Sequence, residues 1–262
     1  MFKANLAVIG GTGVYKAEML ENAKRVDFET RYGKANLLLG TYQGRNVVFL
    51  ARHGKGHSVP PHLINYRANI QALRDLGVKK IIATAAVGSL NKEMAPRDFV
   101  LIDQFLDFTK TRKSTFFEGR FRGVEHVDLT NPYCPGIRRF LSEKAEELGL
   151  KVHQGGCYVC TEGPRFETAA EIKMFKQLGG DVVGMTSVPE VVLAREAGIC
   201  YAAVCMVTNY AAGISPTMLT HEEVLEVTQQ LNKDMSRLLM SVLAEITLEK
   251  DCECTQGITG TP

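Results

Sequence analysis

Three short segments of the sequence carry residues suited to binding a small oxyanion. Arg52 and His53 are adjacent after an apolar run, where arginine offers a fixed fork of N–H donors to a tetrahedral anion and histidine adds a further donor. The turn Gly10–Gly13 contains Thr12, and the amides of such a glycine-rich turn form an anion nest. Thr186 lies at the expected start of a helix, where backbone amides favour an anion. Each segment alone is weak, but together they indicate a site of phosphate size.

A second group of residues is suited to a planar heterocycle. Asn209 follows the apolar run Ile199–Val207, and its amide offers both a donor and an acceptor to a ring edge such as that of a purine. Phe166 could stack on such a ring, and Glu167 could accept from a ring N–H. Each residue also has a plain structural explanation, because asparagine favours turns and glutamate is favoured in the first turn of a helix.

The elements that must position these residues alternate between strands and helices. The apolar runs typical of buried strands are Asn5–Ile9, Ala35–Leu39, Val47–Leu50, Lys80–Ala86, Phe99–Ile102, Val152–Thr161, Asp181–Gly184 and Ile199–Val207. Helical patterns cover His62–Leu76, Cys134–Leu148, a segment ending at Leu178, Ser187–Ala197 and His221–Leu248. The alternation predicts a single α/β domain over residues 1–250, with a mixed, largely parallel β-sheet flanked by helices on both faces, and a short tail at 251–262. In such sheets ligands bind at the carboxyl ends of the strands.

Composition excludes several classes of function. The 262 residues are 45% hydrophobic and 23% charged, the ordinary balance of a soluble globular protein. A net charge of +2 is too small to indicate a nucleic-acid partner. No run approaches the ~18 apolar residues of a membrane helix, and the amino terminus lacks the features of a signal peptide. We therefore expect a cytoplasmic protein with no membrane or nucleic-acid partner.

The seven cysteines are many for a cytoplasmic enzyme. Cys157 and Cys160 have the CxxC spacing of a redox or zinc site, but no second ligand pair accompanies them in sequence. Buried free cysteines are the simpler interpretation there. Cys252 and Cys254 form a CxC pair in the tail, which we expect to be frayed. We find no set of ligands that suggests a metal.

Taken in order along the chain, these segments closely resemble one family, that of the trimeric purine nucleoside and methylthioadenosine phosphorylases. The similarity runs from about residue 5 to residue 246. The motifs that match are IGGTG at 9–13, LARHG at 50–54, NYRANI at 65–70, TAAVGSL at 84–90, EGPRFET at 162–168, VVGMTSVPE at 182–190 and EAGICYAAVCMVTNYAAG at 196–213. The resemblance implies the nucleoside phosphorylase fold. It also implies reversible phosphorolysis, with phosphate as co-substrate and with neither a metal nor an organic cofactor.

The resemblance further implies a role for individual residues. Phosphate would be held by Thr12, Arg52, His53, the backbone amide of Ala86 and Thr186. The nucleoside would lie against Ala85, Phe166, Met185, Asn209, Tyr210 and Ala211. The residues expected to act in catalysis are Asn209, Glu167 and His53. His126 would reach the 5′ pocket of a neighbouring subunit in a homotrimer or a dimer of trimers.

Three positions favour 6-oxopurine nucleosides, inosine and guanosine. The segment Thr208–Ala211 reads T-N-Y-A. In methylthioadenosine phosphorylases the matching segment reads like T-D-Y-D, and its aspartates suit a 6-amino purine. Glu167 would accept from the N1–H that only 6-oxopurines carry. A mismatched buried polar contact costs roughly 1–3 kcal/mol. His221 resembles the histidine that bonds a ribose 5′-hydroxyl, although it could simply begin the last helix.

Other readings stay open within this resemblance. A methylthioinosine phosphorylase would share Asn209 and Glu167 but prefer an apolar 5′ pocket, and a methylthioadenosine phosphorylase would prefer a 6-amino base. A catalytically silent nucleoside-binding protein is disfavoured, since Arg52, His53 and Thr186 are all present. The tail CxC resembles that of some heat-stable members of the family, in which such pairs form disulfides. The hypothesis is that Cys252 and Cys254 are oxidised, with further bridges among Cys134, Cys200 and Cys205.

Overall fold

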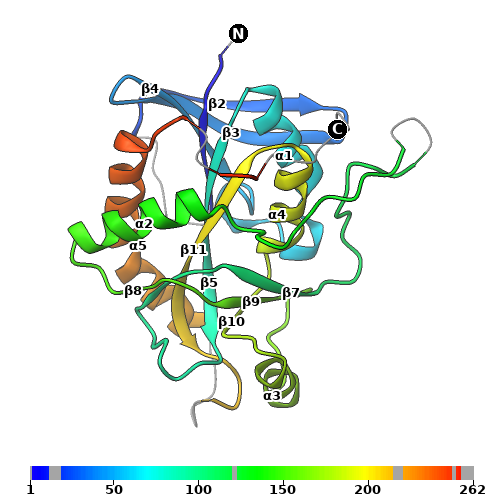
Figure 1. Ribbon diagram of the computed structural model, residues 1–262, viewed down its shortest axis with the longest axis vertical. Coiled ribbons are helices and arrows are strands. Elements are labelled where there is room, and N and C mark those ends of the chain that lie inside the picture. The colour runs from blue at the N-terminus through cyan, green and yellow to red at the C-terminus, as the bar shows by residue number, and fades with distance from the viewer. Residues whose placement is uncertain (1, 12–18, 120–122, 215–220, 250–251, 255–262) are drawn as a thin grey trace.

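The longest strand of the described chain, β11 (Cys200–Tyr210), runs through the middle of the molecule (Figure 1). Its side chains alternate between two hydrophobic clusters. Tyr201 and Ala203 belong to the cluster on one face, and Ala202 and Val204 to the cluster on the other. A strand buried on both faces has an unbroken apolar sequence, which is why the sequence predicts it.

The computed structural model describes residues 2–11, 19–119, 123–214, 221–249 and 252–254, with the backbone alone at residues 55 and 221–225. The remaining strands are β1 (Leu6–Gly10), β2 (Glu21–Thr30), β3 (Gly33–Tyr42), β4 (Arg45–Ala51), β5 (Lys80–Ser89), β6 (Phe99–Leu101), β7 (Gln104–Phe108), β8 (Val152–His153), β9 (Cys157–Thr161) and β10 (Val182–Gly184). The helices are α1 (Tyr66–Asp75), α2 (Pro135–Glu147), α3 (Ala169–Gln177), α4 (Ser187–Glu196) and α5 (His221–Glu245), with short 3₁₀ turns at Lys55–His57 and Pro61–Leu63.

The described strands form one mixed sheet in a single domain, as the sequence predicts. Its main order is β2-β3-β4-β1-β5-β10-β9-β7, and β11 joins it through β5 and continues to β6 and β8. The pairs β1–β4, β1–β5, β5–β11, β6–β8, β7–β9 and β9–β10 are parallel, whereas β2–β3, β3–β4, β5–β10 and β6–β11 are antiparallel. Parallel neighbours bring the carboxyl ends of β1, β4, β5 and β11 to one edge.

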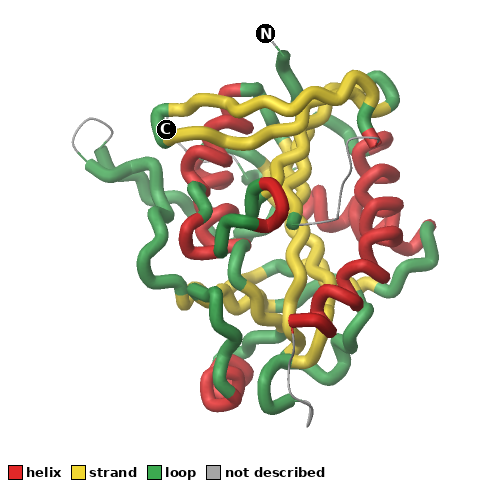
Figure 2. Tube along the Cα trace, turned by 180° about the vertical axis from the view of Figure 1, so that it is seen from behind, coloured by secondary structure: helices red, strands yellow, loops and turns green. Residues whose placement is uncertain are grey.

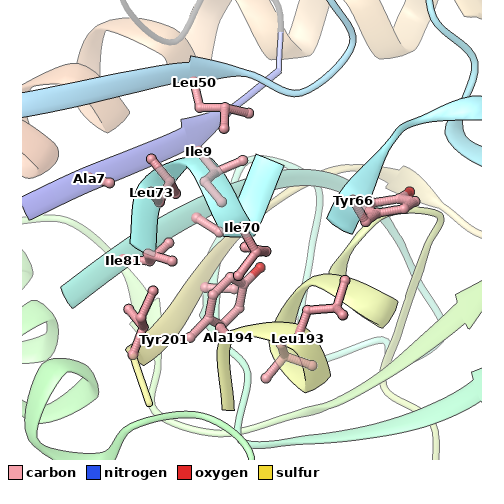
Figure 3. Packing of buried hydrophobic residues seen from close by; sticks show 14 of the residues in the cluster. Ala7, Ile9, Leu50, Tyr66, Ile70, Leu73, Ile81, Leu193, Ala194 and Tyr201 are labelled. Atoms are coloured by element: carbon pink, nitrogen blue, oxygen red, sulfur yellow. The ribbon is translucent and has the colours of Figure 1, made fainter. Parts of the chain in front are cut away.

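Helices cover both faces of the sheet, as expected (Figure 2). On one face α1 packs against β2, β3 and α4, and α4 packs against β11; Figure 3 shows Ile70 and Leu73 of α1 and Leu193 and Ala194 of α4 within that cluster. On the other face α2 and α5 pack against β11 and against each other. None of the helices in the described ranges is long and apolar enough to cross a membrane.

Local capping decides where the helices begin. α1 begins at Tyr66 rather than at His62, because the Asn65 side chain accepts from the backbone N–H of Ala68 and the preceding Pro61–Leu63 segment forms a 3₁₀ turn. α2 follows Cys134, with proline at its first position as helices favour. The sequence therefore predicts the helices well and their first turns less well.

Several elements differ from expectation. β7 was not expected, and the strand expected over Val152–Thr161 is divided into β8 and β9. β2 was not expected, because this edge strand is largely exposed and its sequence, ENAKRVDFET, lacks an apolar run. The tail was expected to be frayed, yet Cys254 is only 4% exposed and packs into the α2–α5 cluster. The division of the chain at residue 250 stays a prediction.

Candidate functional site

A cavity of about 730 Å³ opens at the carboxyl ends of β5 and β11. The segments after β1, β4, β9 and β10 complete its wall. It brings together most of the residues that the sequence singles out. These are Arg52, His53, Ala85, Ala86, Phe166, Glu167, Met185, Thr186, Asn209 and Ala211.

Two predicted residues, Tyr210 and His126, are not among those that line this cavity, and the side chains of two others lie outside the described part. Thr12 lies outside the described residues, although its neighbour Gly11 lines the cavity. Tyr210 is not among the residues that line it, and its hydroxyl donates to the Lys92 carbonyl at 3.4 Å, so its contact with a substrate stays a prediction. His126 is exposed on a segment that extends away from the sheet (Figure 1). His221 is the first residue of α5, and its side chain is outside the described part.

Arg52 is held rigidly at one end of the cavity by Glu190. Its Nε and Nη2 donate to the two Glu190 carboxylate oxygens at 2.7 and 2.8 Å, and its Nη1 donates to the Thr84 carbonyl at 3.0 Å. Burial disfavours the charged form of Arg52, but the Glu190 carboxylate outweighs it and raises the pKa above its ordinary value. A guanidinium has five N–H donors, so one on each terminal nitrogen is left for an anion.

Glu190 is a residue whose importance the sequence does not reveal. It is fully buried in the first turn of α4, and it also accepts from the Tyr201 hydroxyl at 2.8 Å. In sequence it reads as an acidic residue favoured by the helix dipole. The structure instead makes it the group that fixes the Arg52 fork.

His53 lies beside Arg52 with its ring oriented by the backbone. Its Nδ1 is 2.9 Å from the Val59 carbonyl, and because a carbonyl only accepts, Nδ1 carries the proton. Its ring stacks on that of His57 with centroids 4.0 Å apart. Burial, then the Arg52 charge, lowers the His53 pKa to about 4. With Nδ1 donating to the Val59 carbonyl, the neutral ring presents Nε2 as an acceptor, which is suited to a phosphate O–H.

Hydroxyl groups and the start of a helix complete this end of the cavity. Thr186 precedes α4 without capping it, and its backbone N–H donates to the Tyr158 hydroxyl at 3.1 Å. Thr84, which the sequence analysis left out, also lines the cavity, and its buried hydroxyl has no hydrogen-bond partner within the described residues. The Thr84 hydroxyl is shielded from solvent, and the group of Thr84 with an assigned partner at this end is its carbonyl, which accepts from Arg52.

Asn209 presents its amide at the other end of the cavity, where a bulge in β11 changes the strand register after Val207. The Thr208 hydroxyl donates to Asn209 Oδ1 at 2.8 Å, and Asn209 Nδ2 donates to the Tyr210 carbonyl at 2.9 Å. One lone pair and one N–H of the amide then stay available. This combination matches an N7–H donor beside a 6-oxygen acceptor.

Glu167 is the second polar group at this end. The Thr161 hydroxyl donates to its Oε1 at 2.6 Å, which leaves Oε2 free to accept from a ligand. Burial raises the pKa of Glu167. Phe166, the aromatic residue beside Glu167, is 41% exposed at the mouth of the cavity.

Gly163 packs closely against Met185 in the cavity wall. A Cβ added to Gly163 would lie 2.5 Å from the Met185 sulfur. Gly163, with φ of +66°, therefore makes room for Met185 in the wall.

Comparison with known proteins identifies the family. The family model for the phosphorylase superfamily matches residues 5–244. A probable 6-oxopurine nucleoside phosphorylase of Dictyoglomus turgidum is 56% identical over 253 residues, covering 97% of this chain and 96% of that protein. The 6-oxopurine nucleoside phosphorylase of Pyrococcus furiosus is 52% identical over 260 residues, covering 97% of this chain and 98% of that protein.

The chain belongs to the phosphorylase superfamily. Its structure agrees, because a methylthioadenosine phosphorylase from an antarctic soil metagenomic library superimposes with a TM-score of 0.92 at 35% identity, covering 99% of this chain and 92% of that one. The methylthioadenosine phosphorylase of Schistosoma mansoni in complex with adenine gives a TM-score of 0.90 at 35% identity, covering 95% of this chain and 93% of that one. The S-methyl-5′-thioadenosine phosphorylase of Nitrosopumilus maritimus is 44% identical to this chain, covering 97% of this chain and 96% of that protein.

Arg112 is a structural centre of this phosphorylase that the sequence analysis missed. Its buried guanidinium donates to the backbone carbonyls of Met185, Val188, Thr161 and Glu162 at 2.7–3.0 Å. It thereby ties the segment after β9 to the segment after β10, which carry the Glu167 and Thr186 sides of the cavity. The only sequence signal was a basic residue in a loop, which usually means an exposed charge.

The buried, neutral His53 makes the stability of this phosphorylase depend on pH. The unfolded histidine takes up a proton near its ordinary pKa of 6.5, whereas the folded one does so near 4. The unfolded state thus binds more protons between these values, so stability falls as pH decreases from 6.5 to 4, by about 3 kcal/mol at most. Urea unfolding at pH 7.5 and pH 5 should show this loss in the wild type and a smaller one in His53→Gln. An equal loss in both would contradict it.

The cysteines correct one expectation about this phosphorylase and agree with another. All seven are free in the structure, which contradicts the disulfide hypothesis. Cys157 and Cys160, whose spacing suggests a redox or zinc pair, belong to no cluster of possible metal ligands in the described chain, in agreement with their reading as free cysteines.

Proposed function

We propose that this protein catalyses the reversible phosphorolysis of 6-oxopurine nucleosides, converting inosine or guanosine and phosphate to the free base and ribose 1-phosphate. One observation carries the proposal. A single cavity has a rigid guanidinium with free donors at one end, and at the other an asparagine amide and a carboxylate, each with a free hydrogen-bonding group. The greater similarity to relatives named 6-oxopurine nucleoside phosphorylase than to those named methylthioadenosine phosphorylase supports it.

At the phosphate end, Arg52 would neutralise the dianion, and neutral His53 would accept from its remaining O–H through Nε2. The backbone amide of Ala86 and the hydroxyls of Thr12 and Thr186 would bind the other oxygens. The bound anion would then lie below the sugar. As the C1′–N9 bond breaks, the sugar becomes an oxocarbenium-like cation, and a fixed negative charge next to it lowers the barrier. Bond formation between a phosphate oxygen and C1′ completes the transfer.

At the base end, Asn209 and Glu167 would stabilise the leaving purine. The base accumulates negative charge as it departs, and protonation at N7 makes it a neutral leaving group. N7 takes this proton from solvent, and the phosphate O–H returns one proton to solvent as ribose 1-phosphate forms. Asn209 Oδ1 would accept from N7–H while its amide donates to the 6-oxygen. Glu167 would accept from N1–H. Phe166 and Met185 would pack on the base and the sugar. This chemistry assigns no step to a metal or an organic cofactor.

The 5′ end of the substrate would be read by two histidines. We propose that His221 bonds the ribose 5′-hydroxyl and that His126 enters this pocket from a neighbouring copy in a homotrimer or a dimer of trimers. The exposure of His126 and its position on a segment away from the sheet support a contact with another copy.

The test is phosphate-dependent base release from inosine, guanosine, adenosine, methylthioinosine and methylthioadenosine, compared by kcat/KM. We expect inosine and guanosine to be fast and adenosine to be slower by roughly 10²-fold, since two mismatched polar contacts at 1–3 kcal/mol each oppose it. If methylthioinosine is the best substrate, the base assignment stands and the role of His221 is wrong. A best rate with methylthioadenosine would overturn the account of the base pocket. Phosphate binding without turnover would instead support a silent binding protein.

A further inference from the structure

Four of the seven cysteines meet at one point, far apart in sequence and away from the cavity. Cys134 precedes the first turn of α2, Cys200 begins β11, and Cys252 and Cys254 belong to the segment after α5. Their four sulfur atoms all lie within 4.8 Å of one another. Cys134, Cys200 and Cys254 are buried, and Cys252 is partly exposed. We name these residues the four-cysteine cluster.

The arrangement of the sulfur atoms fits a metal ion better than two disulfides. A disulfide requires sulfur atoms about 2.05 Å apart. The Cys200 and Cys252 sulfurs are 3.3 Å apart, and all four sulfurs lie within 4.8 Å of one another. Four thiolates bound to one zinc ion at about 2.3 Å lie at the corners of a tetrahedron with edges of about 3.8 Å. Small side-chain movements would bring the four-cysteine cluster to that geometry.

The surrounding backbone holds the ligands at this point independently of any ion. The Cys134 backbone N–H donates to the Tyr201 carbonyl at 2.7 Å, which joins the start of α2 to the start of β11. Arg45 donates to the carbonyls of Leu243 and Ile246 at the end of α5, and Lys80, the register partner of Cys200, donates to the Glu249 carbonyl at 3.1 Å. The chain is thus directed from α5 back to Cys200 before Cys252 is reached.

We propose that Cys134, Cys200, Cys252 and Cys254 form a structural binding site for one soft divalent metal ion, Zn²⁺. Four soft thiolate ligands in a tetrahedron select zinc over hard cations, and a closed set of four protein ligands leaves no position for a substrate. Cys200 and Thr208 are at opposite ends of β11, separated by eight residues or about 26 Å at ~3.3 Å per residue. The ion therefore ties the carboxyl-terminal segment and α2 to the sheet and takes no part in phosphorolysis.

The first experiment measures zinc in the full-length protein purified under reducing conditions without chelator. We expect about one zinc per chain in the wild type, less than ~0.1 in the double variant Cys252→Ser/Cys254→Ser, and about one in the matched control Cys157→Ser, whose cysteine lies outside the cluster. Protein stripped of metal and kept reduced should bind one equivalent of Co²⁺ and show the charge-transfer and visible bands of tetrahedral cobalt thiolate. Zinc should raise the Tm of the stripped wild type and leave kcat/KM unchanged.

Two results would overturn the site. One is the absence of stoichiometric zinc together with failure of the reduced, stripped wild type to take up added Zn²⁺ or Co²⁺. The other is a thiol titration of the denatured, unreduced wild type that finds only three free thiols, because this would place the four-cysteine cluster in two disulfides. The stripped wild type is itself a test of binding, so the conclusion does not depend on the folding of the double variant.

Discussion

Replacing Glu190 by glutamine should lower kcat/KM for phosphate by about 10²-fold and destabilise the fold by about 3 kcal/mol. Glutamine keeps the shape of the side chain but offers one acceptor and an N–H₂ group that faces the Arg52 donors. Removing one partner of a buried ion pair leaves an uncompensated charge, which costs 3–5 kcal/mol in proteins. Displacement of a positioning group by about 1 Å can reduce a rate by 10²-fold. The geometry makes Glu190 a positioning residue, because it acts through Arg52.

A matched control separates positioning from simple destabilisation. Glu196 lies in the same helix, is also buried, and accepts from the Thr115 hydroxyl and the Phe116 amide, away from the cavity. Glu196→Gln should reduce stability while leaving the phosphate KM unchanged. Initial rates with phosphate varied at saturating inosine, and then with inosine varied, would show a rise in the phosphate KM for Glu190→Gln alone. If both variants change the same parameters, Glu190 serves stability only.

Replacing Asn209 by aspartate should reduce the preference for inosine over adenosine by about 10²-fold. The carboxylate loses the donor that faces a 6-oxygen, and it gains an acceptor suited to a 6-amino group and a protonated N7. A mismatched or unmade polar contact at a buried site costs roughly 1–3 kcal/mol. The substitution removes this cost for adenosine and imposes it on inosine. The new carboxylate would still accept from the Thr208 hydroxyl, so that hydrogen bond at the β11 bulge is kept, whereas the one from Asn209 Nδ2 to the Tyr210 carbonyl is lost.

The measurement is the ratio of kcat/KM for the two nucleosides at saturating phosphate. Asn46→Asp is the matched control, since Asn46 makes the same kind of contact with the backbone, to the Lys3 carbonyl, far from the cavity. Glu167→Gln should change the ratio in the same direction, because glutamine can donate to the unprotonated N1 of adenosine. An unchanged ratio in Asn209→Asp and in Glu167→Gln would mean that neither residue reads the base.

The correct sequence predictions rest on local patterns. The run around Ala202 and Val204 is apolar at every position because both faces of β11 are covered, so strand and fold class follow from the sequence. Arg52 and Asn209 are predicted at the site because polar side chains at the ends of such strands meet at one edge of a parallel sheet. The exposed strand β2 escapes notice, because an edge strand that buries little needs no apolar signal.

Residues whose partners lie far along the chain escaped the sequence analysis. Nothing in a single sequence shows that Glu190 holds Arg52, 138 residues away, or that Arg112 joins two segments through four backbone carbonyls. The protonation state of His53 was likewise decided by burial and by the Val59 carbonyl. Such roles depend on distance in space and on exclusion of water, and both arise only after the sheet has formed.

The cysteines show most clearly how sequence spacing and tertiary packing differ in the residues that they bring to attention. The sequence alone determined their number and spacing, and by spacing it drew attention to Cys157 and Cys160, which meet no further ligand in the described structure. Tertiary structure selected a different set, because the start of α2, the start of β11 and the segment after α5 meet at the amino end of the central strand. Sequence thus fixes which groups a chain possesses and which elements carry them, whereas packing between distant elements decides which groups come close enough to act together.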